Sequence, residues 1–163
     1  MKINKSKHYG IWIVSGALFV TIAFWMTTSN SGLSEKSSRE IALACTSDMA
    51  TQFHVHTNLE IIDNGASFDI PDNIGVRSNC MNAIHTHGEK GKIHVEAPVK
   101  KDFTLGDFFA VWGRPFSKDQ LLDNKADATH QIRVTVNGQE VNTFENTVLK
   151  DDDSIRITYG SKR

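Results

Sequence analysis

The sequence predicts an α+β domain built mainly from antiparallel β-hairpins, with one helix covering the apolar face of a sheet. Three observations support this class: short segments of alternating apolar and polar residues, turn residues between them, and one segment with helical periodicity. Roughly 110 residues from position 51 onward are enough for one domain with one core. We divide the chain into residues 1–31, 32–50 and 51–163.

Residues 1–31 are predicted to form a short cytoplasmic tail and a transmembrane helix. Lys2, Lys5 and Lys7 precede an apolar run at residues 10–26. Roughly 17 to 19 helical residues, at about 1.5 Å each, nearly span a hydrocarbon core of about 30 Å. The lysines favour a cytoplasmic N-terminus, so a single-pass anchor would place the domain outside the plasma membrane. Cleavage as a signal peptide is the alternative, although residues 29–31 make a poor cleavage site.

Residues 32–50, rich in serine and charge, are expected to be a linker or a short helix. This segment contains Cys45, and the only other cysteine is Cys80. In an oxidising compartment a disulfide between them is the first interpretation, worth roughly 3 to 4 kcal/mol in the chain-entropy model. The alternative assigns Cys80 to a metal site as a thiolate, which would favour a softer metal such as Cu(I).

Three hairpins are predicted in residues 51–163, each with two alternating segments joined by residues that accept a positive φ. Their turns are Asn64-Gly65, Glu89-Lys90 bracketed by glycines, and Asn137-Gly138. The hairpins are expected at 53–70, 84–96 and 130–144, and a last strand is expected at 154–159.

One helix is predicted between the second and third hairpins. Thr104 is a candidate N-cap with Asp107 three residues later, and Gly113 can end the helix. The segment carries an apolar stripe suited to covering a sheet, formed by Leu105, Phe108, Phe109 and Trp112. A second short helix is expected to begin at residues 117–120.

Histidines are concentrated in one part of the chain. Five of the seven lie within residues 54–94, in three segments that alternate with apolar or β-branched residues. A spacing of i, i+2 puts two side chains on the same side of a strand, so each segment has an apolar face and a histidine face. The candidate metal ligands are His54, His56, His85, His87 and His94.

The second hairpin gives a specific ligand pair. If Glu89 and Lys90 form the turn centre, His85 lies opposite His94. Opposed side chains have Cβ atoms roughly 4.5 to 5.5 Å apart, close enough to share one ion. A site rich in imidazole and poor in carboxylates indicates copper or zinc rather than Ca²⁺ or Mg²⁺. His130, which also precedes an alternating strand and an Asn-Gly turn, is a weaker sixth candidate.

Metal binding or delivery is the function that this pattern favours, and four alternatives remain open. The histidines could form a solvated polar face, or a cluster that loosens on protonation. Three of them could hold the ion of a metal-dependent enzyme with Glu96 as its base. The domain could also be a metal-free interaction module of a membrane complex.

The charge balance argues against a nucleic-acid partner. Setting aside the three N-terminal lysines leaves 15 basic residues against 19 acidic ones. A domain that binds the phosphate backbone usually carries a clear excess of basic residues. We therefore expect the membrane and a metal ion as partners, with a membrane protein as a further candidate.

A set of motifs spans residues 45–160: His-x-His before an Asn-Gly hairpin, Ile-Pro, Cys-x4-His-x-His-Gly, Gly-x-Ile-His-Val-Glu and Phe-Thr-Leu-Gly-x-Phe-Phe-x-Val-Trp-Gly. Together they resemble an uncharacterised family of exported, membrane-anchored archaeal and bacterial proteins. Gly88 stands where that pattern often has Asp, which removes one carboxylate near the histidines. The resemblance implies an exported domain and brings no assigned activity with it.

Overall fold

The computed structural model describes residues 32–33, 35–48 and 50–162. The chain separates into two compact units, Met1–Lys36 and Ser37–Arg163. The predicted transmembrane helix lies outside the described residues. Within the described ranges, no helix is long and apolar enough to cross a membrane.

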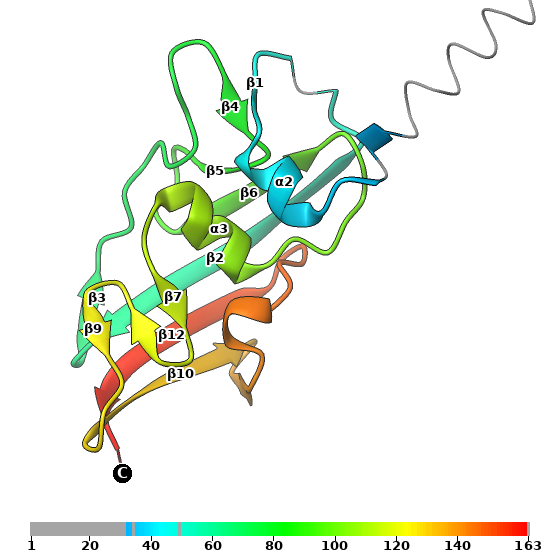
Figure 1. Ribbon diagram of the computed structural model, residues 1–163. Coiled ribbons are helices and arrows are strands. Elements are labelled where there is room, and N and C mark those ends of the chain that lie inside the picture. Colours follow the sequence, from blue (N-terminus) through cyan, green and yellow to red (C-terminus); the bar gives the residue numbers. More distant parts are fainter. Residues whose placement is uncertain (1–31, 34, 49, 163) are drawn as a thin grey trace, which may run out of the picture. The chain divides into compact units, whose positions relative to one another are not determined.

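A seven-stranded sheet forms the centre of the second unit (Figure 1). Neighbouring strands are antiparallel except β2 and β12, which are parallel. The prediction of an α+β domain with mostly antiparallel strands is therefore confirmed. The order across the sheet is β11 (Gln139–Val141), β10 (His130–Val136), β12 (Ser154–Ser161), β2 (Phe53–Asp63), β6 (Lys92–Ala97) and β5 (Ile84–Thr86), with β3 (Ala66–Phe68) also paired to β2.

All three predicted hairpins are present, as β2–β3, β5–β6 and β10–β11. The first and third close through Asn64-Gly65 and Asn137-Gly138, whose φ angles of 50°, 86°, 51° and 79° are all positive. Such turns match the right-handed twist of paired strands. The return strands are shorter than predicted, and after β11 the chain forms a 3₁₀ helix, η1 (Phe144–Asn146).

The predicted helix is α3 (Leu105–Trp112). Thr104 and Asp107 form a reciprocal capping box, and Gly113 ends the helix at φ 72°. Both caps satisfy backbone groups that the first and last turns leave unpaired. Helix α3 buries Phe108 and Phe109 in the core above the sheet, as its apolar stripe predicts.

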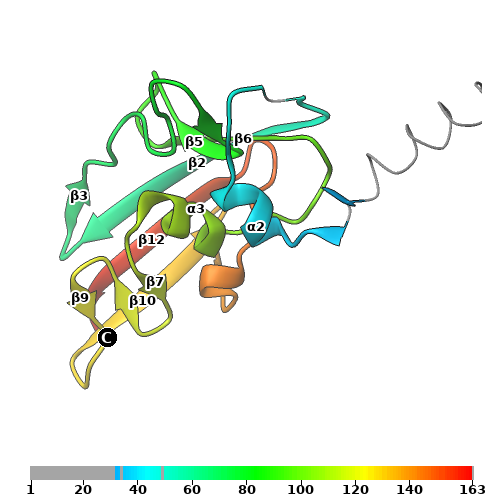
Figure 2. The ribbon, with the colours of Figure 1, turned by 45° about the horizontal axis from the view of Figure 1, so that its top comes forward.

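Helix α2 (Ser38–Leu43) lies beside α3 on the same face of the sheet (Figure 2). The Arg39 guanidinium joins the two helices: it donates to the Gly106 carbonyl at 2.8 Å and lies 2.9 Å from the Asp107 carboxylate. Ile41 and Ala42 are buried. The segment expected as a linker or short helix thus contains a helix that packs on the domain.

The prediction of a second helix beginning at residues 117–120 is wrong. Residues 116–125 form a three-stranded sheet of β7 (Phe116–Ser117), β8 (Gln120–Leu121) and β9 (Asn124–Lys125). The Ser117 hydroxyl accepts a hydrogen bond from the Asp119 backbone N–H, which favours a tight turn over a first helical turn. Leu122 has φ 53°, which a right-handed helix excludes.

A disulfide joins Cys45 to Cys80, with an S–S distance of 2.02 Å and Cα atoms 5.4 Å apart. It links β1 (Cys45–Thr46) to β4 (Met81–Asn82), which also pair as strands. The alternative in which Cys80 is a metal thiolate is therefore wrong. In the chain-entropy model, closing a loop of this length stabilises the fold by about 4 kcal/mol.

The turn of the β5–β6 hairpin approaches β2 closely at Gly91. Gly88 and Gly91 have nearly equal φ angles of 74° and 72°. A Cβ at Gly91 would lie 2.4 Å from the Leu59 carbonyl oxygen, whereas a Cβ at Gly88 would meet no atom of the described residues within 4 Å. The Leu59 N–H also donates to the Gly91 carbonyl at 2.7 Å. Gly91 therefore fixes how the hairpin lies along β2.

We predict that Gly91→Ala destabilises the domain more than Gly88→Ala. The left-handed backbone costs about 1 to 2 kcal/mol in both variants, and the collision adds about 1 to 3 kcal/mol at Gly91 alone. Urea unfolding of the two variants measures the difference. Equal losses of unfolding free energy would show that the close approach to Leu59 does not constrain the hairpin.

Candidate metal centre

Strand β6 is the middle strand of the region that carries the histidines. Across the β2–β6 pair, His56 lies opposite His94 and His54 lies opposite Glu96. Across β5–β6, His85 lies opposite His94, which confirms the register expected from the turn. His94 therefore has a histidine on each side, in one row across three strands.

The strands present two different faces. Val55, Ile93 and Val95 point into the core and are almost fully buried, while the residues that alternate with them point to the other side. We call this other side the histidine face; it carries His54, His56, His85, His87 and His94. The structure thus brings together all five histidines that the sequence singled out.

The imidazole rings are in mutual contact. His87 and His94 stack with centroids 4.2 Å apart, and His85 stacks with His94 at 5.4 Å. On the other side, His56 meets His94 edge to face at 4.6 Å, and His54 lies 4.5 Å from His56. His94 is therefore the centre of the cluster.

Two groups of three histidines have ligand nitrogens within 4.8 Å of one another. We name them the β5 triad (His85, His87 and His94) and the β2 triad (His54, His56 and His94). Nitrogens on one tetrahedral zinc ion lie about 3.3 Å apart, given Zn–N bonds of about 2.0 to 2.1 Å. Side-chain rotations that close a gap of about 1.5 Å would bring either triad to that geometry.

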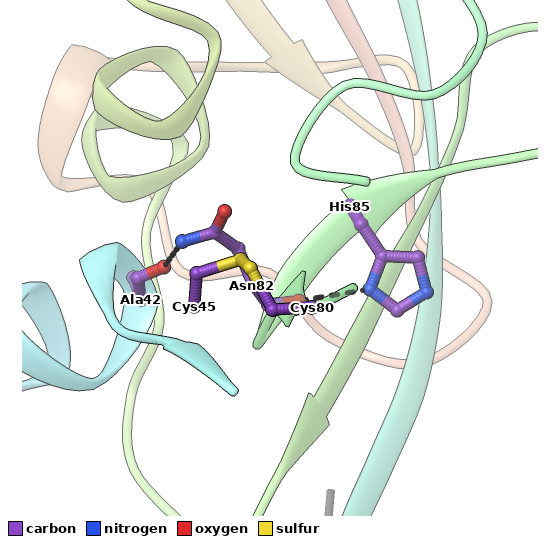
Figure 3. The surroundings of a disulfide bond; sticks show 5 residues. All are labelled: Ala42, Cys45, Cys80, Asn82 and His85. Carbon is purple, nitrogen blue, oxygen red and sulfur yellow. Dashed lines mark hydrogen bonds between the residues drawn. A yellow bond between two sulfur atoms is a disulfide. The ribbon is translucent and has the colours of Figure 1, made fainter. Parts of the chain in front are cut away.

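His85 is the most constrained member. Its side chain is fully buried, and Nδ1 lies 3.1 Å from the backbone carbonyl of Asn82 (Figure 3). A carbonyl only accepts, so Nδ1 carries the proton and Nε2 of the neutral ring holds a lone pair. Within the described part of the chain, no hydrogen-bond partner reaches Nε2. Leaving a buried polar atom unpaired costs about 1 to 3 kcal/mol, which a metal ligand bond would offset.

Asn82 is a supporting residue that the sequence did not reveal. Its side-chain amide donates to the Ala42 carbonyl at 2.9 Å, and it follows the disulfide cysteine by two positions (Figure 3). Helix α2 and the disulfide therefore hold the carbonyl that orients His85. Such a contact beyond the ligand fixes the ring and its tautomer in metal sites. An asparagine three residues before a histidine is too common a pattern to have indicated this role.

Two carboxylates lie beside the histidines. One Glu96 oxygen is 3.4 Å from Nε2 of His54 and 3.9 Å from Nε2 of His85, so it lies between the two triads. An Asp151 oxygen is 3.9 Å from Nδ1 of His56 and accepts the His56 backbone N–H at 2.8 Å. The sequence indicated Glu96 but not Asp151, because 95 positions separate Asp151 from His56.

Two imidazoles of the cluster, those of His85 and His94, favour the neutral form. Burial, followed by repulsion from His87, His56 and His85, lowers the pKa of His94 to about 4. Burial also lowers the pKa of His85, opposed by the Asn82 carbonyl and by Glu96. Neutral imidazole is the form that binds metal, so protons compete weakly with a metal ion at these two positions.

His130 does not belong to the cluster. It lies on β10, which β12 separates from β2, and its ring stacks on Tyr159 at 5.4 Å. Its Nδ1 is 3.2 Å from an Asp127 oxygen. The sixth candidate is therefore absent from both triads.

No protein-family model, curated protein or solved structure matches this chain. The function is therefore argued from the histidine face itself.

We predict that the His94 ring of the metal-free protein titrates near pH 4 instead of near 6.5. The unfolded chain binds this proton at higher pH, so the contribution of neutral His94 to stability is complete above about pH 6.5 and declines as the pH falls toward 4. Histidine-ring NMR with a chelator present follows the titration. A midpoint at or above 6.5 would contradict the burial and crowding described for this ring.

Proposed function

We propose that the protein binds a transition-metal ion on the histidine face and serves to hold or deliver it. The buried His85 carries this proposal, because its Nδ1 contacts the Asn82 carbonyl and its Nε2 has no hydrogen-bond partner among the residues that the structure describes. A histidine that only packed in the core would be expected to satisfy both nitrogens. A fixed tautomer with a free lone pair among other imidazoles is the arrangement of a metal ligand.

Copper and zinc are the metals that this donor set fits best. Imidazole suits Zn(II) and Cu(II), whereas Ca²⁺ and Mg²⁺ require mostly oxygen ligands. Among the described residues, the five imidazoles outnumber the carboxylates that interact with them, which include Glu96, Asp151 and the exposed Glu89. Both cysteines are in the disulfide, so a thiolate does not contribute.

Accessibility supports binding and release over a closed structural site. The side chains of His54 and His56 are 46% and 38% exposed, in contrast to His85. Structural zinc sites are usually four-coordinate and closed. An ion on the β2 triad would remain within reach of a partner or of solvent.

We further propose that the domain lies outside the plasma membrane on a single-pass anchor. The lysines before the apolar run at residues 10–26 support this orientation. A disulfide agrees with an oxidising compartment.

The proposed location can be tested by protease digestion of intact cells. Externally added protease should digest residues 37–163 of the cell-bound protein without prior lysis. A cytoplasmic protein is the control, because its digestion would show that the cells had broken. Protection of the domain until the cells are lysed would contradict the proposed orientation.

We predict that the full-length protein binds Zn(II) or Cu(II) with a dissociation constant below about 1 µM, and that His94→Ala weakens binding at least about a hundredfold. His94 belongs to both triads, so its loss affects every arrangement of ligands. Competition with a chromophoric chelator measures the affinities.

The matched control for this experiment is His130→Ala. It removes a partly buried strand histidine that lies outside both triads, so it should leave metal affinity unchanged. Circular dichroism of both variants checks that the fold is retained. Equal effects of the two substitutions, or no binding by the unaltered protein, would refute the proposed function.

A further inference from the structure

We propose that the histidine face holds one metal ion at a time in either of two adjoining positions, the β5 triad and the β2 triad, and that the ion passes between them around His94. This inference rests on the proposed metal-binding function and extends it to the route of the ion.

The register places the two positions on opposite sides of β6. His85 and His56 both lie opposite His94, but on the two neighbouring strands. Adjacent strands are about 4.8 Å apart, so the backbones of His85 and His56 are separated by about 10 Å. The close ligand atoms accordingly fall into two groups, one on the β2 side of His94 and one on the β5 side. An ion held by one of these triads lies on one side of His94 or on the other.

His94 can serve both positions because it contacts both sets of rings. It stacks on His87 at 4.2 Å and meets His56 at 4.6 Å. The two groups of close ligand atoms are distinct, and each includes His94. A neutral imidazole offers one lone pair, so His94 binds one ion at a time unless it also loses its second proton.

Local charge favours single occupancy. Two divalent ions would bring four positive charges to a region with three nearby carboxylates, Glu96, Asp151 and the exposed Glu89. Repulsion between ions a few ångströms apart in a partly buried site is strong. The first ion therefore weakens the binding of a second.

Glu96 gives the ion a second shared contact. One of its oxygens lies near Nε2 of His54, in the β2 triad, and near Nε2 of His85, in the β5 triad. An ion that leaves one triad thus stays beside His94 and Glu96 until it reaches the other. Each triad has one exposed member, His54 or His87, but only the β5 triad also contains the fully buried His85. The histidine face thus forms a short path between two accessible positions, one of which ends at a buried ligand.

Zn(II) titration of the full-length protein and three variants tests this proposal. His87→Ala weakens the β5 triad, His54→Ala weakens the β2 triad, and the third variant carries both changes. Both residues are exposed, so their removal should preserve the fold, which circular dichroism verifies. Chelator competition gives stoichiometry and affinity, and histidine-ring NMR shows which rings respond.

Two alternative positions give a distinctive pattern. The unaltered protein should bind one Zn(II), and each single substitution should lower the affinity less than about tenfold because the other triad remains. The double substitution should lower it at least about a hundredfold, more than the product of the single effects. One equivalent of Zn(II) should shift ring signals of both triads in the unaltered protein, but mainly those of the β2 triad in His87→Ala.

Three other outcomes would overturn the inference. Two Zn(II) ions bound with similar affinity would indicate a binuclear site. A single substitution that reproduces the whole loss would indicate one fixed position, and metal binding itself would stand in both cases. If the unaltered protein binds neither Zn(II) nor Cu(II) with a dissociation constant below about 1 µM, the proposed function fails together with the inference.

Discussion

The register of β6 between β2 and β5 is the constraint on which the rest of the site depends. Side chains alternate along a strand, so a slip of one residue would turn His94 into the core and Ile93 out of it. Such a slip would bury imidazoles in place of apolar side chains, at a large cost in free energy. The core thereby fixes the register, and the close contact of Gly91 with Leu59 fixes where the hairpin turns.

The same sheet supplies stability on one face and function on the other. Apolar residues of β2, β6 and β5 pack against Phe108 and Phe109 of α3, and this burial is the main source of folding free energy. The opposite face crowds five imidazoles together, which repel one another when protonated and leave one nitrogen of His85 unpaired. An unfavourable arrangement that persists in a stable fold is often a functional site.

The buried end of the histidine face is held from outside the main sheet. His85 is oriented by the Asn82 carbonyl, and Asn82 is held by Ala42 of α2 and by the nearby Cys45–Cys80 disulfide. Helix α2 is in turn fixed to α3 through Arg39 and Asp107. A series of contacts thus connects α2 to the candidate ligand His85 through Asn82. Sites of this kind depend on supporting residues as much as on the ligands themselves.

The sequence by itself determined the local features of this protein. The capping residues of α3, the Asn-Gly turns and the alternation of the strands follow from φ preferences and hydrogen bonds within a few residues, and all are present. The opposition of His85 and His94 was also predictable, because one short turn sets their register. The prediction of a helix beginning at residues 117–120 failed because a serine can begin either a helix or a tight turn. The pairing of the neighbouring strands decides between the two.

Only the tertiary structure decided which distant segments meet. The pairing of β2 with β6 places His56 beside His94, and the parallel pairing of β2 with β12 follows a loop that brings Asp151 to His56. The contacts of Asn82 with Ala42 and His85 have the same origin. Strand alternation states which face a residue occupies, but neighbouring strands are chosen by burial summed over the whole core. For this reason the sequence indicated the five histidines as candidate metal ligands, whereas their division into two triads around His94 came from the fold.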